Sequence, residues 1–362
     1  MSKKKVAILY GGKSAEYDVS IQTAFSIINA IDKEKYEIMP IHISHEGQWI
    51  EGTAIKDKLE HKSQLLLSEK TGNEMAAGKW LTPAAVNPVQ SKPDIIFPLL
   101  HGPNGEDGTV QGLMELLGIA YVGSGVLGSA SGMDKVIMKD LFKAHQLNQP
   151  KYLSVTKYEW EHRQSDIFEK IKAAIGCPCF IKPANLGSSI GISQCLEEKA
   201  IIKAVNEAFC FDDKVIIEEK IIGREIEIGV LGNDALAASV PGEIKTGGEF
   251  YDYQSKYQDG NSTLLISAYL TEEIRTEVEQ TAFKAFKILN CKGLARADFF
   301  IRDSDRKVII NEINTMPGFT PYSMFPLLWE HSGLSYADLI DRLINLGIER
   351  HEERQNIRYR IE

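Results

Sequence analysis

The sequence predicts an α/β fold, because short apolar runs with strand character alternate with longer segments of helical spacing. Residues 5–10, KVAILY, are typical of a buried parallel strand, and the turn GGKSAEYDVS leads from it into a helix expected to end near residue 30. Further strands are predicted at residues 36–44 and 93–100. Since 362 residues are many for a single hydrophobic core, we expect two or three domains.

The first domain is expected to span residues 1–124 and to contain a parallel sheet. Residues 110–119 have helical spacing, and residues 120–124 are typical of a short strand. Residues 51–93 are less regular, so we expect them to cover or extend the sheet.

A second domain is expected over residues 125–221. Its predicted elements are, in order, a helical stretch at 124–147, a strand at 177–184, a glycine- and serine-containing loop at 185–191, a returning strand at 190–195, a helix at 196–209 and a strand at 214–221.

The third domain is expected over residues 222–362. Its predicted elements are a strand at 224–232, a polar segment at 246–262, a helix at 271–289, two strands at 293–302 and 307–314, and closing helices near 323–331 and 335–348. A long polar segment inside a compact domain is typical of a functional lid, which is the role predicted for 246–262.

Composition excludes several classes of function. A net charge of −9 argues against a broad nucleic-acid surface. No segment approaches the roughly 20 apolar residues that span a membrane, so no membrane association is expected.

Cys177 and Cys179 are separated by one proline, a spacing that suits neither a common zinc site nor a usual disulfide. Buried thiols in a reducing compartment are expected instead, which predicts a cytoplasmic protein.

The strand VIINEIN contains a carboxylate and an amide two residues apart, Glu312 and Asn314, which therefore face the same way. If Arg302 pairs with Val308 in the predicted hairpin, Asp298 lies opposite Glu312. A register shifted by one residue would put the two acids on opposite faces, and the sequence leaves this open.

Three oxygen-bearing side chains on one face would suit Mg²⁺, which completes its coordination with water and phosphate. Asp298, Glu312 and Asn314 are therefore candidate metal ligands. The alternative is that the acids are solvated or paired with Arg296 or Arg302.

A second set of residues is suited to phosphates and a nucleotide. Lys182 ends a strand just before the loop NLGSSIG, whose backbone amides could face phosphate oxygens, although an ordinary hairpin turn fits as well. Lys135 lies on a helix, where it could equally be solvated. In the segment IIEEKIIGREIE, Glu219 and Glu225 could flank a connection that binds adenine, or they could be surface charges on an edge strand.

Together these segments resemble the D-alanine–D-alanine ligase family of ATP-grasp enzymes. The resemblance rests on seven motifs in order between residues 9 and 323: LYGGKSAEYDVS, HGPNGEDGTVQG, GSASGMDK, FIKPANLGSSIG, EFYDYQSKY, GLARADFF and NEINTMPGFTPYS.

The resemblance implies a three-domain ATP-grasp architecture, with an N-terminal parallel α/β domain and two α+β domains clamping ATP. It implies that ATP activates the carboxylate of one D-alanine and that the amine of a second D-alanine attacks the acyl phosphate, which supplies a peptidoglycan precursor. It also implies two Mg²⁺ ions, with Mn²⁺ as an alternative, and a homodimer.

The resemblance also implies roles for individual residues. In the catalytic centre, Glu16 would hold the ammonium of the first D-alanine in a hydrogen-bonded group with Ser188 and Tyr257. Arg296 and the backbone N–H of Gly318 would stabilise the oxyanion, and the metal ions would be held by Asp298, Glu312 and Asn314. His101 would line the pocket of the first substrate, and Lys256 and Ser323 would bind the carboxylate of the second. Phosphates would be held by Lys135 and Lys182, and adenine and ribose would be contacted by Glu219, Ile222 and Glu225.

Two other functions are weighed against this one. A depsipeptide ligase would join D-alanine to D-lactate, but such relatives replace the lid segment that here keeps Lys256 and Tyr257. A non-catalytic nucleotide-binding regulator would be expected to lack metal ligands or Arg296, all of which are present.

Overall fold

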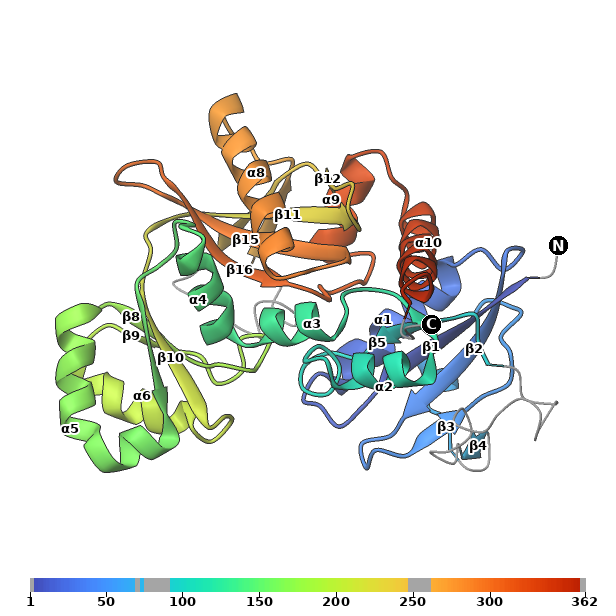
Figure 1. Cartoon of the computed structure of the whole chain (residues 1–362), viewed down its shortest axis with the longest axis horizontal. Coiled ribbons are helices and arrows are strands. Elements are labelled where there is room, and N and C mark those ends of the chain that lie inside the picture. The colour runs from blue at the N-terminus through green and yellow to red at the C-terminus, as the bar shows by residue number, and fades with distance from the viewer. Residues whose placement is uncertain (1–2, 69–71, 75–91, 247–261, 359–362) are drawn as a thin grey trace.

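The computed structural model describes residues 3–68, 72–74, 92–246 and 262–358, and three sheets follow one another along the chain in three lobes (Figure 1). The predicted α/β class is confirmed. Over the described ranges, no helix is both long and apolar enough to cross a membrane.

The first sheet has the order β4-β3-β2-β1-β5-β6. The four neighbouring strands β2, β1, β5 and β6 run parallel to one another, as predicted. Its elements are β1 (Lys4–Gly11), α1 (Tyr17–Ala30), β2 (Tyr36–Ile43), β3 (Trp49–Glu51), η1 (Lys62–Leu65), β4 (Asn73–Glu74), β5 (Ile95–Leu99), α2 (Thr109–Leu117) and β6 (Ala120–Tyr121). The segment after β2 extends the sheet through the antiparallel strands β3 and β4.

The second sheet is antiparallel, with the order β7-β10-β8-β9. Its elements are β7 (Tyr152–Thr156), α5 (Lys157–Ala174), β8 (Cys179–Pro183), β9 (Ser193–Cys195), η2 (Glu198–Ala200), α6 (Ile201–Ala208) and β10 (Lys214–Glu219). Neither β7 nor α5 is predicted from the sequence, although Thr156 and Glu159 form the capping box that starts α5.

The helical stretch predicted at 124–147 is two helices, α3 (Val126–Met133) and α4 (Lys135–Ala144). The chain is extended at Asp134, whose carboxylate accepts bonds from the backbone N–H groups of Val136 and Ile137. An aspartate that caps a new helix explains the break and places Lys135 at the first position of α4.

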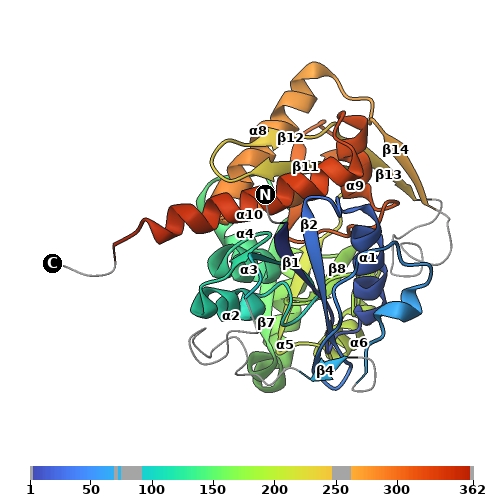
Figure 2. The same cartoon turned by 90° about the vertical axis from the view of Figure 1, so that its right-hand side faces the viewer.

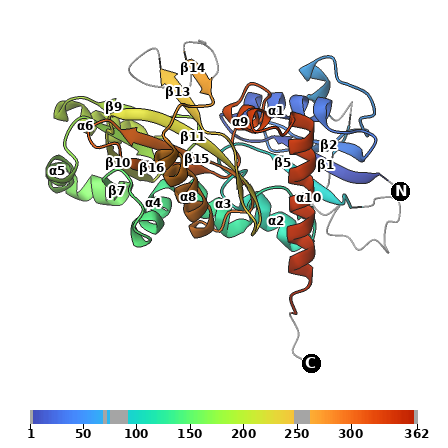
Figure 3. The same ribbon diagram turned by 90° about the horizontal axis from the view of Figure 1, so that it is seen from above.

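The third sheet has the order β14-β13-β11-β15-β16, with β12 paired to β11. Its elements are β11 (Gly223–Gly232), β12 (Ala237–Ala238), β13 (Gly242–Thr246), β14 (Ser262–Ile266), α8 (Glu272–Ile288), β15 (Gly293–Arg302), β16 (Val308–Asn314), α9 (Met324–His331) and α10 (Tyr336–Gln355). Helix α10 is longer than predicted, and its far end projects beyond the rest of the molecule (Figures 2 and 3).

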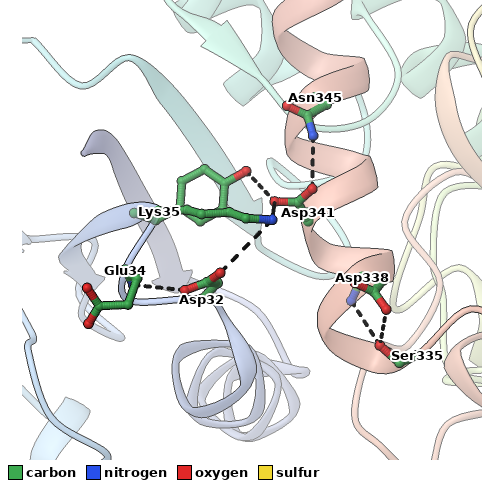
Figure 4. A network of polar contacts seen from close by, with 8 residues as sticks. Asp32, Glu34, Lys35, Ser335, Asp338, Asp341 and Asn345 are labelled. Carbon is green, nitrogen blue, oxygen red and sulfur yellow. Dashed lines mark hydrogen bonds and ion pairs between the residues drawn. The ribbon is translucent and has the colours of Figure 1, made fainter. Parts of the chain in front are cut away.

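Helix α10 belongs to the end of the chain but packs on the first sheet. Its buried residues Leu339, Ile340, Leu343 and Ile344 share one hydrophobic core with residues of β1, β5 and α1. At the edge of this contact, Asp341 accepts a 2.8 Å hydrogen bond from the Tyr36 hydroxyl and lies 3.2 Å from Lys35 Nζ (Figure 4). The first and last parts of the chain are therefore held together by one continuous core.

Candidate active site

The turn after β1 places the first predicted site residue. Gly11 has φ +91°, and a Cβ there would lie 2.2 Å from the backbone oxygen of Ile43, so the turn requires glycine. The backbone N–H of Gly11 donates to Ser20 in the first turns of α1. This tight junction fixes Glu16 as the residue that immediately precedes α1.

Glu16 and Ser188, predicted to act together, are in contact. Glu16 is buried, and the Ser188 hydroxyl donates a hydrogen bond to its carboxylate. Ser188 and its neighbour Ser189 both have positive φ, 50° and 59°, which is a strained conformation for a residue with a side chain. Such strain is concentrated at functional sites, and here it points the hydroxyl at the carboxylate.

His101 lies beside this pair, as predicted, and Glu106 completes the group. His101 is buried, and its Nε2 has no hydrogen-bond partner among the residues that the structure describes. Burial lowers the pKa of His101, although the charge of Glu16 opposes the shift. Glu106 accepts a 2.7 Å bond from the backbone N–H of Gly102. Burial, reinforced by the charge of Glu16, raises the pKa of Glu106 to about 8.

Lys135 anchors the loop that contains Ser188. Its backbone N–H donates to the oxygen of Ala184 at 3.0 Å, and its ammonium donates to the oxygen of Leu186 at 2.7 Å. The ammonium therefore lies at the start of the predicted phosphate loop. This position fits the predicted phosphate contact.

Lys182 is paired with a carboxylate that sequence analysis does not single out. Its Nζ lies 2.6 Å from Glu218 Oε2, and Lys139 Nζ lies 2.9 Å from Glu218 Oε1. Desolvation alone would lower the pKa of Lys182, but the charges of Glu218 and Glu312 outweigh it and raise that pKa. The two lysines overcome the desolvation of Glu218 and lower the pKa of its carboxyl to about 2.

The three residues predicted to contact the nucleotide are half-buried or exposed. Glu219 accepts a 2.8 Å bond from the backbone N–H of Lys151, and Ile222 is 66% exposed. The charge of Glu225 contributes to the raised pKa of Lys182, so Glu225 lies within electrostatic reach of the lysine. Strand periodicity puts Glu218 on the same face as Ile216, which is the register partner of Lys182, but the sequence does not contain that register.

Asp298 lies directly opposite Glu312 in the β15–β16 hairpin. The predicted pairing is confirmed, but the register assumed for it is wrong, because Val308 pairs with Ile301 rather than Arg302. A bulge between Asp298 and Phe299 compensates for the difference. One extra residue on β16 therefore restores the alignment of the two acids.

Arg296 joins these acids on the same face, since it pairs with Asn314 two positions along the hairpin. Its guanidinium donates to both carboxylate oxygens of Asp298 at 2.8 Å and lies 3.0 Å from Glu227. Desolvation alone would lower the pKa of Arg296, but the charges of Asp298 and Glu227 outweigh it and hold that pKa well above its usual range. Of the alternative pairings, the one with Arg296 is therefore present at Asp298, whereas the Arg302 guanidinium donates to both carboxylate oxygens of Asp305.

The donor set of this hairpin fits Mg²⁺ chemically. Over the described part of the chain, no three His, Cys, Asp or Glu side chains form a metal-binding group. Two carboxylates and one amide instead supply a few oxygens, the pattern expected where phosphate and water complete the shell. The Asn314 amide nitrogen donates to Asp298 at 2.9 Å, which leaves its oxygen out of that bond.

Gly318 and Ser323 lie next to each other after β16. A Cβ on Gly318 would lie 3.2 Å from Ser323 Oγ, and Ser323 occupies the N-cap position of α9, although its side chain forms no capping bond there. The Ser323 hydroxyl is 2.8 Å from the Thr320 hydroxyl. The predicted oxyanion donor and carboxylate-binding serine therefore occupy one short turn.

Lys256, Tyr257 and the predicted lid at 246–262 lie outside the described residues, apart from the two ends of that segment. Thr246 and Ser262 are paired across β13 and β14.

Comparison with known proteins adds evidence from the whole chain. Residues 5–124 match the model of the D-ala D-ala ligase N-terminus, and residues 141–345 match that of the D-ala D-ala ligase C-terminus. The chain is 53% identical over 363 residues to a D-alanine–D-alanine ligase of Bacillus cytotoxicus, with 100% of both chains covered.

Solved structures agree. The D-alanine–D-alanine ligase of Coxiella burnetii is 36% identical with a TM-score of 0.84, covering 98% of this chain and 97% of that one. The VanG D-Ala:D-Ser ligase of Enterococcus faecalis is 34% identical with a TM-score of 0.84, covering 96% and 100%. A Bacillus anthracis ligase complexed with ATP is 29% identical with a TM-score of 0.73, covering 98% and 100%. The two matching models and the full-length relatives show that this chain belongs to the D-alanine–D-alanine ligase family.

Proposed function

We propose that this chain uses ATP to join two D-alanines into D-alanyl-D-alanine through an acyl phosphate. The observation that supports this most is the β15–β16 hairpin, where Arg296, Asp298, Glu312 and Asn314 occupy alternate register pairs and share one face. A phosphoryl transfer and an acyl transfer could thus be served by neighbouring side chains.

In the first step, a carboxylate oxygen of the first D-alanine attacks the γ-phosphorus, and the bond to the leaving ADP breaks. Glu16 would hold the ammonium of this D-alanine, with Ser188, His101 and Tyr257 around it. A Glu106 that keeps its proton near neutral pH would avoid adding a third negative charge beside Glu16 and the substrate carboxylate.

Lys135 and Lys182 would hold phosphate oxygens, and Glu219, Ile222 and Glu225 would contact adenine and ribose. Asp298, Glu312 and Asn314 would hold two Mg²⁺ ions, or Mn²⁺ in their place. When bound, the ions would neutralise charge on the β- and γ-phosphates.

In the second step, the neutral amine of the second D-alanine attacks the acyl carbon, and phosphate leaves with one of the original carboxylate oxygens. Arg296 and the backbone N–H of Gly318 would stabilise the oxyanion of the tetrahedral intermediate. Ser323 and Lys256 would bind the carboxylate of this second substrate.

The acceptor is the finer part of the proposal, because the similar structures include a D-Ala:D-Ser ligase. Purified enzyme would be given ATP, Mg²⁺ and D-alanine, alone or with excess D-serine or D-lactate, at neutral pH. We expect D-alanyl-D-alanine to dominate the products identified by mass spectrometry. A mixed product formed in preference to the dialanine would overturn the proposed acceptor.

We further propose that the enzyme is a cytoplasmic homodimer, on the support of the family resemblance. Sedimentation of the purified chain would test the dimer, and a sedimenting monomer at assay concentrations would contradict it.

A further inference from the structure

A buried lysine outside the residues assigned above links the two halves of the proposed nucleotide site. Lys139 lies on α4, its side chain is 2% exposed, and its ammonium reaches two other elements. It pairs with Glu218 on β10 at 2.9 Å and donates a 3.0 Å bond to the backbone oxygen of Asn311 on β16.

Such burial needs an explanation, because a charged ammonium is costly to remove from water unless it is paired and hydrogen-bonded. The carboxylate of Glu218 is shared between Lys139 and Lys182, so the three side chains form one buried group. Desolvation lowers the pKa of Lys139, although the charge of Glu218 opposes the shift. Any change at Lys139 would therefore alter how firmly Glu218 attracts Lys182.

The second contact of Lys139 is with the bulge of β16. Asn311 is skipped in the register between the pairs Phe299–Ile310 and Asp298–Glu312. If the pairing continued without the bulge, Glu312 would lie opposite Ala297, and its side chain would leave the face of Asp298. The bulge is thus what brings the two acids together, and Lys139 donates a hydrogen bond to the carbonyl of the bulged residue.

We propose that Lys139 is a positioning residue that holds the bulged strand of the metal ligands and the phosphate-binding lysine Lys182 in one arrangement. This inference rests on the proposed function, in which Lys182 binds phosphate and Glu312 binds metal. It makes Lys139 important for the use of ATP and Mg²⁺ without contact with either.

The test replaces Lys139 by methionine, which keeps much of the length and loses the charge. Outer-shell residues of metal sites are typically worth about 10- to 100-fold in metal affinity or activity. We expect Lys139→Met to raise the half-saturating Mg²⁺ concentration by roughly tenfold or more and to raise KM for ATP, with a much smaller change in KM for D-alanine. The matched control is Lys143→Met, an exposed lysine of the same helix, which should behave like the wild type.

A second variant separates positioning from stability. Glu218→Gln removes the carboxylate that the two lysines share but keeps Lys139 and its bond to the Asn311 carbonyl. It should lower the melting temperature, because two lysines lose their shared buried counter-charge, but it should raise the Mg²⁺ requirement less than Lys139→Met does. A Mg²⁺ requirement that simply follows the melting temperature across the two variants would show a purely structural role and overturn the inference.

Glu312→Gln distinguishes this inference from the proposed function. If Glu312→Gln leaves the Mg²⁺ requirement unchanged, the proposed metal site itself fails. If Glu312→Gln raises that requirement while Lys139→Met does not, the metal site stands and the role of Lys139 is refuted.

Discussion

The Glu106 side chain links the proposed substrate pocket to pH. The raised pKa of about 8 means that the folded protein holds a proton there that the unfolded chain, with an ordinary carboxyl pKa, has lost. The free energy of unfolding contributed by Glu106 therefore decreases as pH rises from the ordinary carboxyl range to about 8, and is flat outside that window.

Glu106→Gln should remove this dependence, because glutamine resembles the protonated acid and its amide oxygen can still accept the bond from Gly102. Denaturant unfolding of both proteins without ligands should show the variant gaining stability relative to the wild type between pH 5 and pH 8. A stability difference that does not change with pH would show that Glu106 titrates normally.

Substitution of Ser188 tests the proposed pocket of the first substrate directly. Loss of a hydrogen bond to a charged group is worth about 1.5–3 kcal/mol, so Ser188→Ala should lower kcat/KM for D-alanine by roughly 10- to 150-fold. Ser189→Ala is the matched control, because Ser189 has a similar positive φ, whereas the hydrogen bond to Glu16 described above is donated by Ser188. Equal losses in the two variants would point to the loop backbone rather than to the hydroxyl.

Site residues differ in how far sequence can locate them. Glu16, Ser188 and His101 are predicted from motifs and come together in the structure, although they are far apart in the chain. Glu218 and Lys139 are missed because their significance depends on packing between β10, α4 and β16. A lysine on an amphipathic helix or a glutamate at a strand end carries no local mark of such a partnership.

At the scale of elements, strongly apolar strands are predictable and register is not. Strands β1, β2 and β5 are apparent from their apolar runs, whereas β7 and α5 are half-exposed or polar and are missed. The pairing of Asp298 with Glu312 is predicted through an incorrect register, because nothing in VIINEIN marks Asn311 as the bulged residue. In the structure, the carbonyl of the bulged residue accepts a hydrogen bond from Lys139, which lies in another element.

The turn from β1 to α1 gives a prediction at this scale. Gly11→Ala would force a side chain into a positive φ, which costs about 1–3 kcal/mol, and would also place Cβ 2.2 Å from the Ile43 oxygen. Gly118→Ala is the control, since Gly118 also has a positive φ but no heavy atom from the described residues lies within 4 Å of the added Cβ.

Denaturant unfolding should show Gly11→Ala to be the more destabilised of the two, with reduced affinity for D-alanine because Glu16 follows the same turn. Equal losses of stability in the two variants would show that the contact between the added Cβ and the Ile43 oxygen does not destabilise the fold.

At the scale of the whole molecule, the first sheet and α10 share a core that also contains Phe319, the residue after Gly318. This core joins the part of the chain that holds Glu16 to the part that holds the proposed oxyanion donor. The sequence predicts both parts separately, but it contains no signal that the last helix completes the first core, because any amphipathic helix could pack on its own sheet.

The relative weight of core and surface contacts at this junction can be measured. Leu343→Ala removes a fully buried side chain of α10 and should cost about 2–5 kcal/mol of unfolding free energy. Asp341→Asn weakens the exposed pair with Lys35, whose side chain is 57% exposed, and should cost no more than about 1 kcal/mol. The reverse order in denaturant unfolding would show that the polar network of Figure 4 is the main connection.

In the proposed reaction, ATP activates one D-alanine as an acyl phosphate within this molecule. Formation of this acyl phosphate is tested most directly with D-alanine whose carboxylate oxygens carry a heavy isotope. The mechanism predicts that one labelled oxygen appears in the released phosphate for each dipeptide formed, since the carboxylate oxygen that attacks the γ-phosphorus leaves with it. Phosphate released without label while dipeptide accumulates would contradict the account.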